Sequence, residues 1–128
     1  MIRFIQPQSV VENWDRIKPL IDKALTKEFY DAEDIKHLCL SGMMMVFVAQ
    51  DYQAVATVEL INHPKQKAAL VHTLGGDGME EWVDELLEEI TKIAKSNGAN
   101  SIQINGRRGW LKRLDGFKEA YTTMVKRI

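Results

Sequence analysis

The stretch that decides the fold is KAALVHTLGGDGMEEWVDELLEEI, residues 67–90. Its first part, AALVHTL, is an apolar run typical of a buried strand. A turn with glycines at 75, 76 and 78 follows. Beyond the turn, apolar residues recur every three or four positions, the spacing of an amphipathic helix; they are Met79, Trp82, Val83, Leu86, Leu87, Ile90, Ile93 and Ala94. The stretch therefore predicts a strand, a glycine-bearing turn and a long helix.

The segments on either side extend this pattern into a sheet. MMMVFVAQ (43–50) and AVATVELI (54–61) are apolar runs joined to each other and to residues 68–74 by short polar links. Such links predict an antiparallel meander. After the long helix, Asn97-Gly98 is a stop signal, and SIQI (101–104) is a strand. A helical crossover between strands predicts that this strand runs parallel to residues 68–74.

The N-terminal part predicts one short strand and two helices. Residues 1–6 form the strand. We expect Ser9 to cap a helix that runs to about residue 27 and is kinked or split at Pro19. Asp31 is a good N-cap for a second helix, which should end near Gly42.

The C-terminal part predicts a short helix over residues 110–114 and a final strand over residues 120–128. The whole chain, residues 1–128, is then a single α/β domain. We expect a mixed, mostly antiparallel sheet of about six strands with helices on both faces.

Composition and charge exclude several classes of function. The chain has 128 residues, a net charge of −1 and one cysteine, Cys39. The near-neutral charge gives no global attraction to nucleic acid or membrane, and one cysteine allows no internal disulfide. No apolar segment approaches the roughly 18 residues that span a bilayer. No metal-ligand spacing, P-loop or nucleophile elbow is present. We expect a cytoplasmic protein without a metal, of open oligomeric state.

The order of elements, with a glycine-bearing turn after the third meander strand, resembles the GNAT superfamily of N-acetyltransferases. The loop signature of that family is Gln or Arg, two residues, Gly, one residue, then Gly or Ala. Gly76 and Gly78 match it, and Thr73 stands where Gln or Arg is expected. In a second signature Asn105 and the Gly116-Phe117 pair match, whereas Arg108 replaces an alanine and Lys112 replaces the tyrosine that commonly acts as general acid.

This resemblance implies that acetyl-CoA binds where the central strand meets the long helix and donates an acetyl group to an unknown small-molecule or protein amine. The implied cofactor-binding residues are Leu74, Gly75, Gly76, Gly78, Asn105 and Trp110. The segment GRRGWLKRLDGF (106–117) also resembles GNAT-like proteins of phage and prophage genomes. The alternative is therefore a non-catalytic phage module for structural or protein contacts, associated with the virion if of phage origin.

The turn itself allows two interpretations. In one, the backbone amides of residues 76–80 bind the phosphates of coenzyme A, since glycine lets the backbone approach a ligand closely. In the other, Asp77 is the N-cap of the helix and Glu80 completes a capping box. The two interpretations compete for the same amides.

Two further groups of residues carry candidate chemistry. Glu59 and His72 are titratable side chains on central strands, where a transferase needs a base to deprotonate an amine; alternatively they are an edge glutamate and a core histidine. A basic cluster, defined as Arg107, Arg108, Lys112 and Arg113, could contact a phosphate or nucleic acid. The alternative is a basic turn that pairs with the acidic helix, with Trp110 packed into the core.

Overall fold

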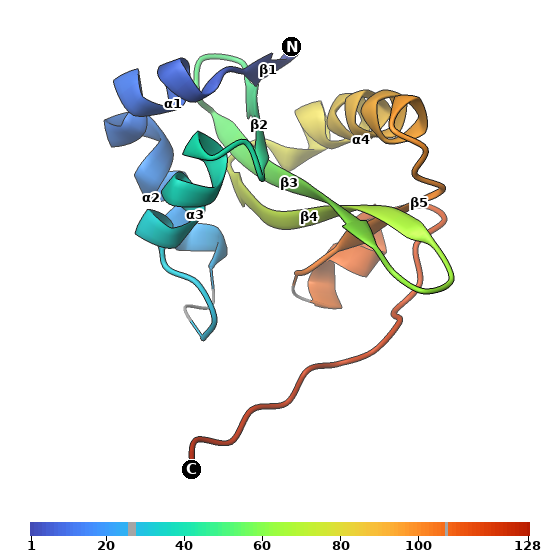
Figure 1. Ribbon diagram of the computed structural model, residues 1–128. Coiled ribbons are helices and arrows are strands. Elements are labelled where there is room, and N and C mark those ends of the chain that lie inside the picture. Colours follow the sequence, from blue (N-terminus) through green and yellow to red (C-terminus); the bar gives the residue numbers. More distant parts are fainter. Residues whose placement is uncertain (26–27, 107) are drawn as a thin grey trace.

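The computed structural model describes residues 1–25, 28–106 and 108–128, and Figure 1 shows their arrangement. The elements follow the chain in this order: β1 (Ile2–Ile5), α1 (Pro7–Glu12), α2 (Trp14–Ala24), α3 (Ala32–Leu40), β2 (Met45–Ala49), β3 (Ala54–Asn62), β4 (Lys67–Gly76), α4 (Met79–Ser96), β5 (Ser101–Ile104) and the short 3-10 helix η1 (Arg108–Arg113). The predicted short helix near residue 110 is thus present, starting two residues earlier.

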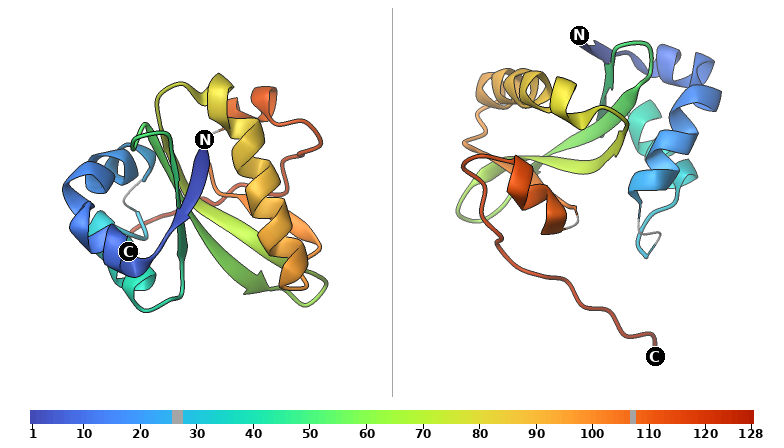
Figure 2. Two further views of the ribbon diagram at one scale, coloured as in Figure 1. Left: turned by 90° about the horizontal axis from the view of Figure 1, so that it is seen from above. Right: turned by 180° about the vertical axis from the view of Figure 1, so that it is seen from behind.

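The strands form one sheet in the order β1-β2-β3-β4-β5. Neighbours from β1 to β4 are antiparallel, and β5 runs parallel to β4 after the crossover through α4. Helices α1 to α3 cover one face and α4 covers the other (Figures 1 and 2). The predicted mixed, mostly antiparallel sheet with helices on both faces is therefore confirmed, with five described strands instead of about six.

A buried apolar cluster fills each side of the sheet. The cluster under α4 contains, among others, Phe47, Val58, Val71, Trp82 and Leu86. The cluster under α1 to α3 contains, among others, Val10, Ile17, Ile35, Val46 and Val48. Alternate residues of each strand point to opposite faces, so the sheet separates these two cores.

The strand predicted over residues 120–128 was wrong. Residues 117–128 have no regular secondary structure, and this segment extends away from the sheet (Figure 1). The apolar and β-branched residues of the segment favour an extended backbone. A strand also needs a neighbouring strand to bond its peptide groups, and no described strand lies beside this segment.

The prediction for the N-terminal helix was wrong in two details. The helix begins at Pro7, not after Ser9, because proline fits the first helical position, where no amide donor is needed. The chain breaks at Asn13, whose side-chain amide donates to the Ser9 carbonyl at 2.9 Å. Pro19 lies inside α2. It removes the bond to the Asp15 carbonyl, yet α2 continues through it to Ala24.

Candidate functional site

The strands β4 and β5 separate part-way along β4. They pair from Ala68 with Ser101 to Val71 with Ile104, and the Asn105 amide donates to the Val71 carbonyl at 3.1 Å. β4 then continues to Gly76 without β5 beside it. In open α/β sheets, ligands bind outside the carboxyl ends of the strands. We therefore take the end of β4, between β5 and α4, as the candidate site.

Each glycine of the turn is required by close backbone packing or by its own backbone conformation. A Cβ atom on Gly75 would lie 2.4 Å from the backbone oxygen of Leu20 in α2. A Cβ on Gly76 would lie 2.4 Å from the backbone oxygen of Gln53, and one on Gly78 would lie 2.1 Å from the Gln53 side-chain nitrogen. Gly76 and Gly78 also have positive φ angles of 143° and 71°. The glycines therefore do not by themselves indicate a ligand.

The helix α4 begins one residue later than the capping-box interpretation predicts, and that interpretation was wrong. Its N-cap is Gly78 in the left-handed conformation, and among the described residues no side chain caps its first amides. The Asp77 amide donates to the Gln53 carbonyl at 3.2 Å, and the Asp77 carbonyl accepts from the Trp82 indole nitrogen at 2.7 Å. These two backbone bonds hold Asp77 outside the helix. Consequently, its carboxylate does not compete with an anion for the helix amides.

The acidic first turn of α4 has a basic partner. Arg113, at the end of η1, donates to the Glu80 carboxylate, and Trp110 is half-buried against the core under α4. The predicted pairing of the basic turn with the acidic helix is confirmed for this pair. Arg107 lies outside the described residues. Pairing lowers the local negative charge that would otherwise repel an anion at this helix terminus.

Glu59 and His72 form a pair on the sheet face that carries α1 to α3. In the register of β3 with β4, Thr57 lies opposite Thr73 and Val58 opposite Val71, so His72 is the extra residue of a β-bulge. The His72 Nε2 and the Glu59 Oε1 are 2.7 Å apart, and their side chains are 9% and 22% exposed. A buried hydrogen bond of 2.6 Å between the Thr57 and Thr73 hydroxyls lies beside the bulge. The two sequence candidates are thus brought into direct contact.

Tyr30 contacts the Glu59–His72 pair, and the sequence analysis did not indicate it. Its ring meets the His72 ring edge-on, with centroids 5.5 Å apart and planes at 76°. The next residue, Asp31, is the N-cap of α3, as predicted, and forms a reciprocal capping box with Asp34. The amide hydrogen bond from Asp34 holds the pKa of Asp31 below its usual value. No sequence spacing connects Tyr30 to His72. The one available signal for Tyr30 was its position directly before the N-cap of a predicted helix.

The other predicted cofactor-binding residues lie near the point where β4 continues without β5, and their environments differ. The Leu74 side chain is buried in the core under α4, which leaves only its backbone for a ligand. Asn105 is exposed directly after β5, and Trp110 stands over Gly106. Lys112 is exposed, so the position where the resemblance expects a tyrosine carries a solvated cation.

Two further findings bear on the kind of site. None of the helices in the described part of the chain is long and apolar enough to cross a membrane. Among those same residues, no group of three or more His, Cys, Asp or Glu side chains is placed to hold a metal ion.

No family model of protein sequence matches the chain, and no curated protein matches it in sequence. Solved structures do match it. An aminoglycoside acetyltransferase from an uncultured soil metagenomic sample, solved with sisomicin, matches the whole chain with a TM-score of 0.71 at 12% identity over 95% of its own length. A ribosomal-protein-alanine N-acetyltransferase from Brucella melitensis biovar Abortus 2308 matches with a TM-score of 0.71 at 13% identity over 99% of its length.

A probable acetyltransferase matches with a TM-score of 0.70 at 12% identity over 98% of its length. These likenesses extend over the full chain, and at such low identities they establish the fold alone. The predicted GNAT-like fold is therefore confirmed, and its structural neighbours are acetyltransferases.

Proposed function

We propose that this protein transfers an acetyl group from acetyl-CoA to an amine, with Glu59 and His72 as the proton-accepting pair. The observation that carries the proposal is the 2.7 Å contact between these two side chains. They lie on β3 and β4, next to the point where β4 leaves β5. A general base must lie within hydrogen-bond reach of the proton that it removes. An amine held on the α1–α3 face of the sheet, beside the end of the β4–β5 pairing, would satisfy that requirement.

The start of α4 and the end of β4 have the groups that acetyl-CoA needs. The amides of residues 78–80, at the start of α4, would hold the pyrophosphate, because a helix N-terminus favours anions and no described side chain caps this one. The Asp77 amide is already bonded to the Gln53 carbonyl. Beyond Val71 the edge of β4 is no longer paired with β5, so its peptide groups could bond the extended pantetheine arm. Asn105 and Trp110 would line the other side of the opening.

The chemistry follows from these roles. Bound acetyl-CoA would supply the acetyl group as a thioester. As the amine forms the carbon–nitrogen bond, the carbon–sulfur bond breaks, and the sulfur leaves as a thiolate that takes a proton from water. Glu59 accepts a hydrogen bond from Nε2 of His72, which leaves Nδ1 as the proton acceptor. The amine proton passes to that nitrogen, and the Glu59 carboxylate stabilises the resulting imidazolium. Proton transfer by a positioned base contributes about 10²- to 10⁴-fold in rate.

Thermal unfolding with acetyl-CoA and with acetyl-pantetheine tests the binding. Acetyl-CoA at 100 times its dissociation constant should add about 2.7 kcal/mol to the free energy of unfolding. Acetyl-pantetheine lacks the pyrophosphate and should stabilise much less at the same concentration. No shift at millimolar acetyl-CoA would rule the proposal out, and equal shifts with both ligands would rule out the phosphate site at α4.

Release of free thiol, measured over a panel of amines, tests the catalytic pair. His72→Asn and Glu59→Gln should each lower kcat by about 10²-fold or more while acetyl-CoA still raises the melting temperature. The matched control is His63→Asn, because His63 also bonds a strand residue, Gln103, at 3.0 Å but lies exposed directly after the end of β3. Equal losses in all three variants would contradict the assigned roles.

The alternative function, a non-catalytic module for protein contacts such as a phage protein, is favoured by two observations. The Thr73 side chain, at the Gln or Arg position of the loop signature, is buried and bonded to Thr57. Lys112, at the tyrosine position, is exposed. Under this alternative acetyl-CoA produces no thermal shift.

A further inference from the structure

The imidazole ring of His72 is held by two neighbours from different parts of the chain. Its Nε2 is 2.7 Å from Oε1 of Glu59 on β3, and its ring meets the Tyr30 ring edge-on, with centroids 5.5 Å apart. A hydrogen bond to one nitrogen fixes the place of that atom, whereas the terminal torsion of a histidine side chain has broad energy minima. The ring can therefore turn unless a second contact fixes its plane. Tyr30 provides this second contact.

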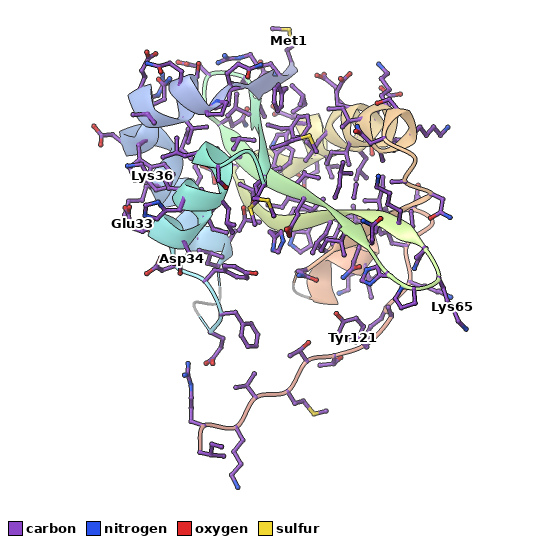
Figure 3. The ribbon with its side chains drawn as sticks, in the orientation of Figure 1. Met1, Glu33, Asp34, Lys36, Lys65 and Tyr121 are labelled. Atoms are coloured by element: carbon purple, nitrogen blue, oxygen red, sulfur yellow. The ribbon has the colours of Figure 1, made fainter. Side chains whose placement is uncertain are left out.

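The backbone of Tyr30 is fixed by the start of α3. The next residue, Asp31, is the N-cap: its carboxylate accepts from the Asp34 amide at 2.9 Å, and its amide donates to the Asp34 carboxylate at 3.0 Å. Figure 3 shows Asp34 at the N-terminal end of α3. Ala32 and Ile35 anchor the same turn in the core under α1 to α3. The capped first turn therefore fixes the chain directly before it, where Tyr30 lies.

The contact with His72 uses the ring of Tyr30 and not its hydroxyl group. Within the described residues, the hydroxyl bonds to neither His72 nor Glu59. His72 is also the extra residue of the bulge in β4, where the pairing of the strands is interrupted. The orientation of its ring is consequently set by side-chain contacts, and an edge-on contact between aromatic rings stabilises a pair beyond its buried area.

We propose that Tyr30 is a positioning residue, through which the capped start of α3 sets the plane of the His72 ring and so the direction of Nδ1. This role rests on the proposed function, in which Nδ1 accepts the amine proton. Catalytic groups need to be held within about 10–20° of the productive geometry. Tyr30 acts only through His72, because the groups proposed for acetyl-CoA lie at the end of β4, the start of α4, and at Asn105 and Trp110.

Steady-state kinetics of thiol release test this role. Tyr30→Leu should lower kcat about two- to twelvefold, the range that corresponds to one aromatic contact, and leave KM for acetyl-CoA unchanged. Tyr30→Phe keeps the ring and should have the kcat of the wild type. The matched control is Phe29→Leu, because Phe29 is 63% exposed and, among the described residues, has no ring contact with His72. This control should also keep the kcat of the wild type.

A double-mutant cycle tests the connection from α3 to the base. Asp31→Ala removes the cap and should lower kcat by less than Tyr30→Leu does. Combined with Tyr30→Leu, it should have no further effect on kcat, because the contact through which it acts is already lost. An equal effect of Asp31→Ala with and without Tyr30→Leu would show that α3 does not act through Tyr30, which overturns the proposal.

Proton NMR of the imidazole ring gives a measurement that needs no acetyl-CoA. The chain has three histidines, and the signals of His72 are those that disappear in His72→Asn. Tyr30→Leu should shift these signals, because the ring current of the tyrosine is removed, whereas Tyr30→Phe should leave them near their wild-type positions. Unchanged signals in Tyr30→Leu would show that the two rings are not in contact, and this result overturns the proposal.

The remaining outcomes separate this role from the proposed function. A wild type that releases no thiol overturns both. An active wild type with unchanged kcat in Tyr30→Leu overturns the positioning role alone, and so does an equal loss in Tyr30→Phe or in Phe29→Leu. A change confined to KM for acetyl-CoA would assign Tyr30 to ligand binding and likewise overturns the positioning role.

Discussion

Replacing Gly75 by alanine should destabilise the fold by about 2–3 kcal/mol, at the upper end of the usual cost of overpacking. The added Cβ would lie 2.4 Å from the backbone oxygen of Leu20 and 3.2 Å from the Ala24 Cβ. Both residues belong to α2, which packs on β4 here. A carbonyl oxygen inside a helix cannot move alone. The clash therefore has to separate the helix from the sheet, or bend β4 at the entrance of the candidate site.

Urea and thermal unfolding measure this effect. A loss of this size should lower the melting temperature by roughly 10 °C in a domain of this length. The matched control is Gly109→Ala, because in the described part of the chain no atom beyond its immediate neighbours lies within 4 Å of a Cβ at that position. Alanine there should be neutral or stabilising by about 0.4–1 kcal/mol, since it restricts the unfolded chain. If Gly75→Ala unfolds like the control, α2 does not lie against Gly75 and the packing argument for this glycine fails.

Three further results are expected. Trp82→Phe should cost about 2–3 kcal/mol in urea unfolding, because it removes the indole bond to the Asp77 carbonyl and leaves a void; Trp14→Phe, at a half-buried position, should cost less than half as much. The pKa of Asp31 is lowered from 3.8 by a backbone hydrogen bond in α3, so its contribution to stability is complete above that pH and disappears as the pH falls through the lowered value. The difference in stability between wild type and Asp31→Asn should therefore shrink below pH 4, and a constant difference would contradict the capping role. Burial raises the pKa of Cys39 to about 11, so a thiol reagent at pH 8 should react only as fast as the protein opens, and urea should accelerate the reaction.

The sequence was sufficient to predict those elements whose hydrophobic pattern repeats over many consecutive residues. The stripe of apolar residues in α4 and the three runs of the meander each repeat over many positions, so their types and order were predicted correctly. The segment 120–128 also contains apolar and β-branched residues, but a pattern does not identify the neighbouring strand. Whether such a segment becomes a strand depends on an edge that the same chain or another must provide.

The start of α4 depends on contacts that are distant in the sequence. Asp77 and Gly78 are both acceptable N-caps, so the local sequence allows either. The choice is made by the Gln53 carbonyl, which holds the Asp77 amide from the β2–β3 turn, and by the Trp82 indole, which holds the Asp77 carbonyl. Neither contact has a spacing that a sequence pattern would reveal.

The contact between Glu59 and His72, the candidate general base, depends on one extra residue in β4. By ordinary alternation His72 faces the same side of β4 as Leu70, and the sequence does not fix its partner across the ladder. With the bulge, His72 meets Glu59, and the His72 ring contacts the Tyr30 ring edge-on. Bulges often re-aim a side chain next to a functional site, but no residue type marks this one.

The same contacts that hold the turn in place also determine whether it can bind an anion. Gln53 packs against Gly78 and accepts from Asp77, so the glycines serve folding. By keeping Asp77 outside the helix, this packing leaves the first amides of α4 without a carboxylate, while Arg113 pairs with Glu80. Folding and anion binding therefore do not compete for this turn. A glycine that is needed for packing can leave free the amides that a cofactor would use, and its structural role is no argument against a functional one.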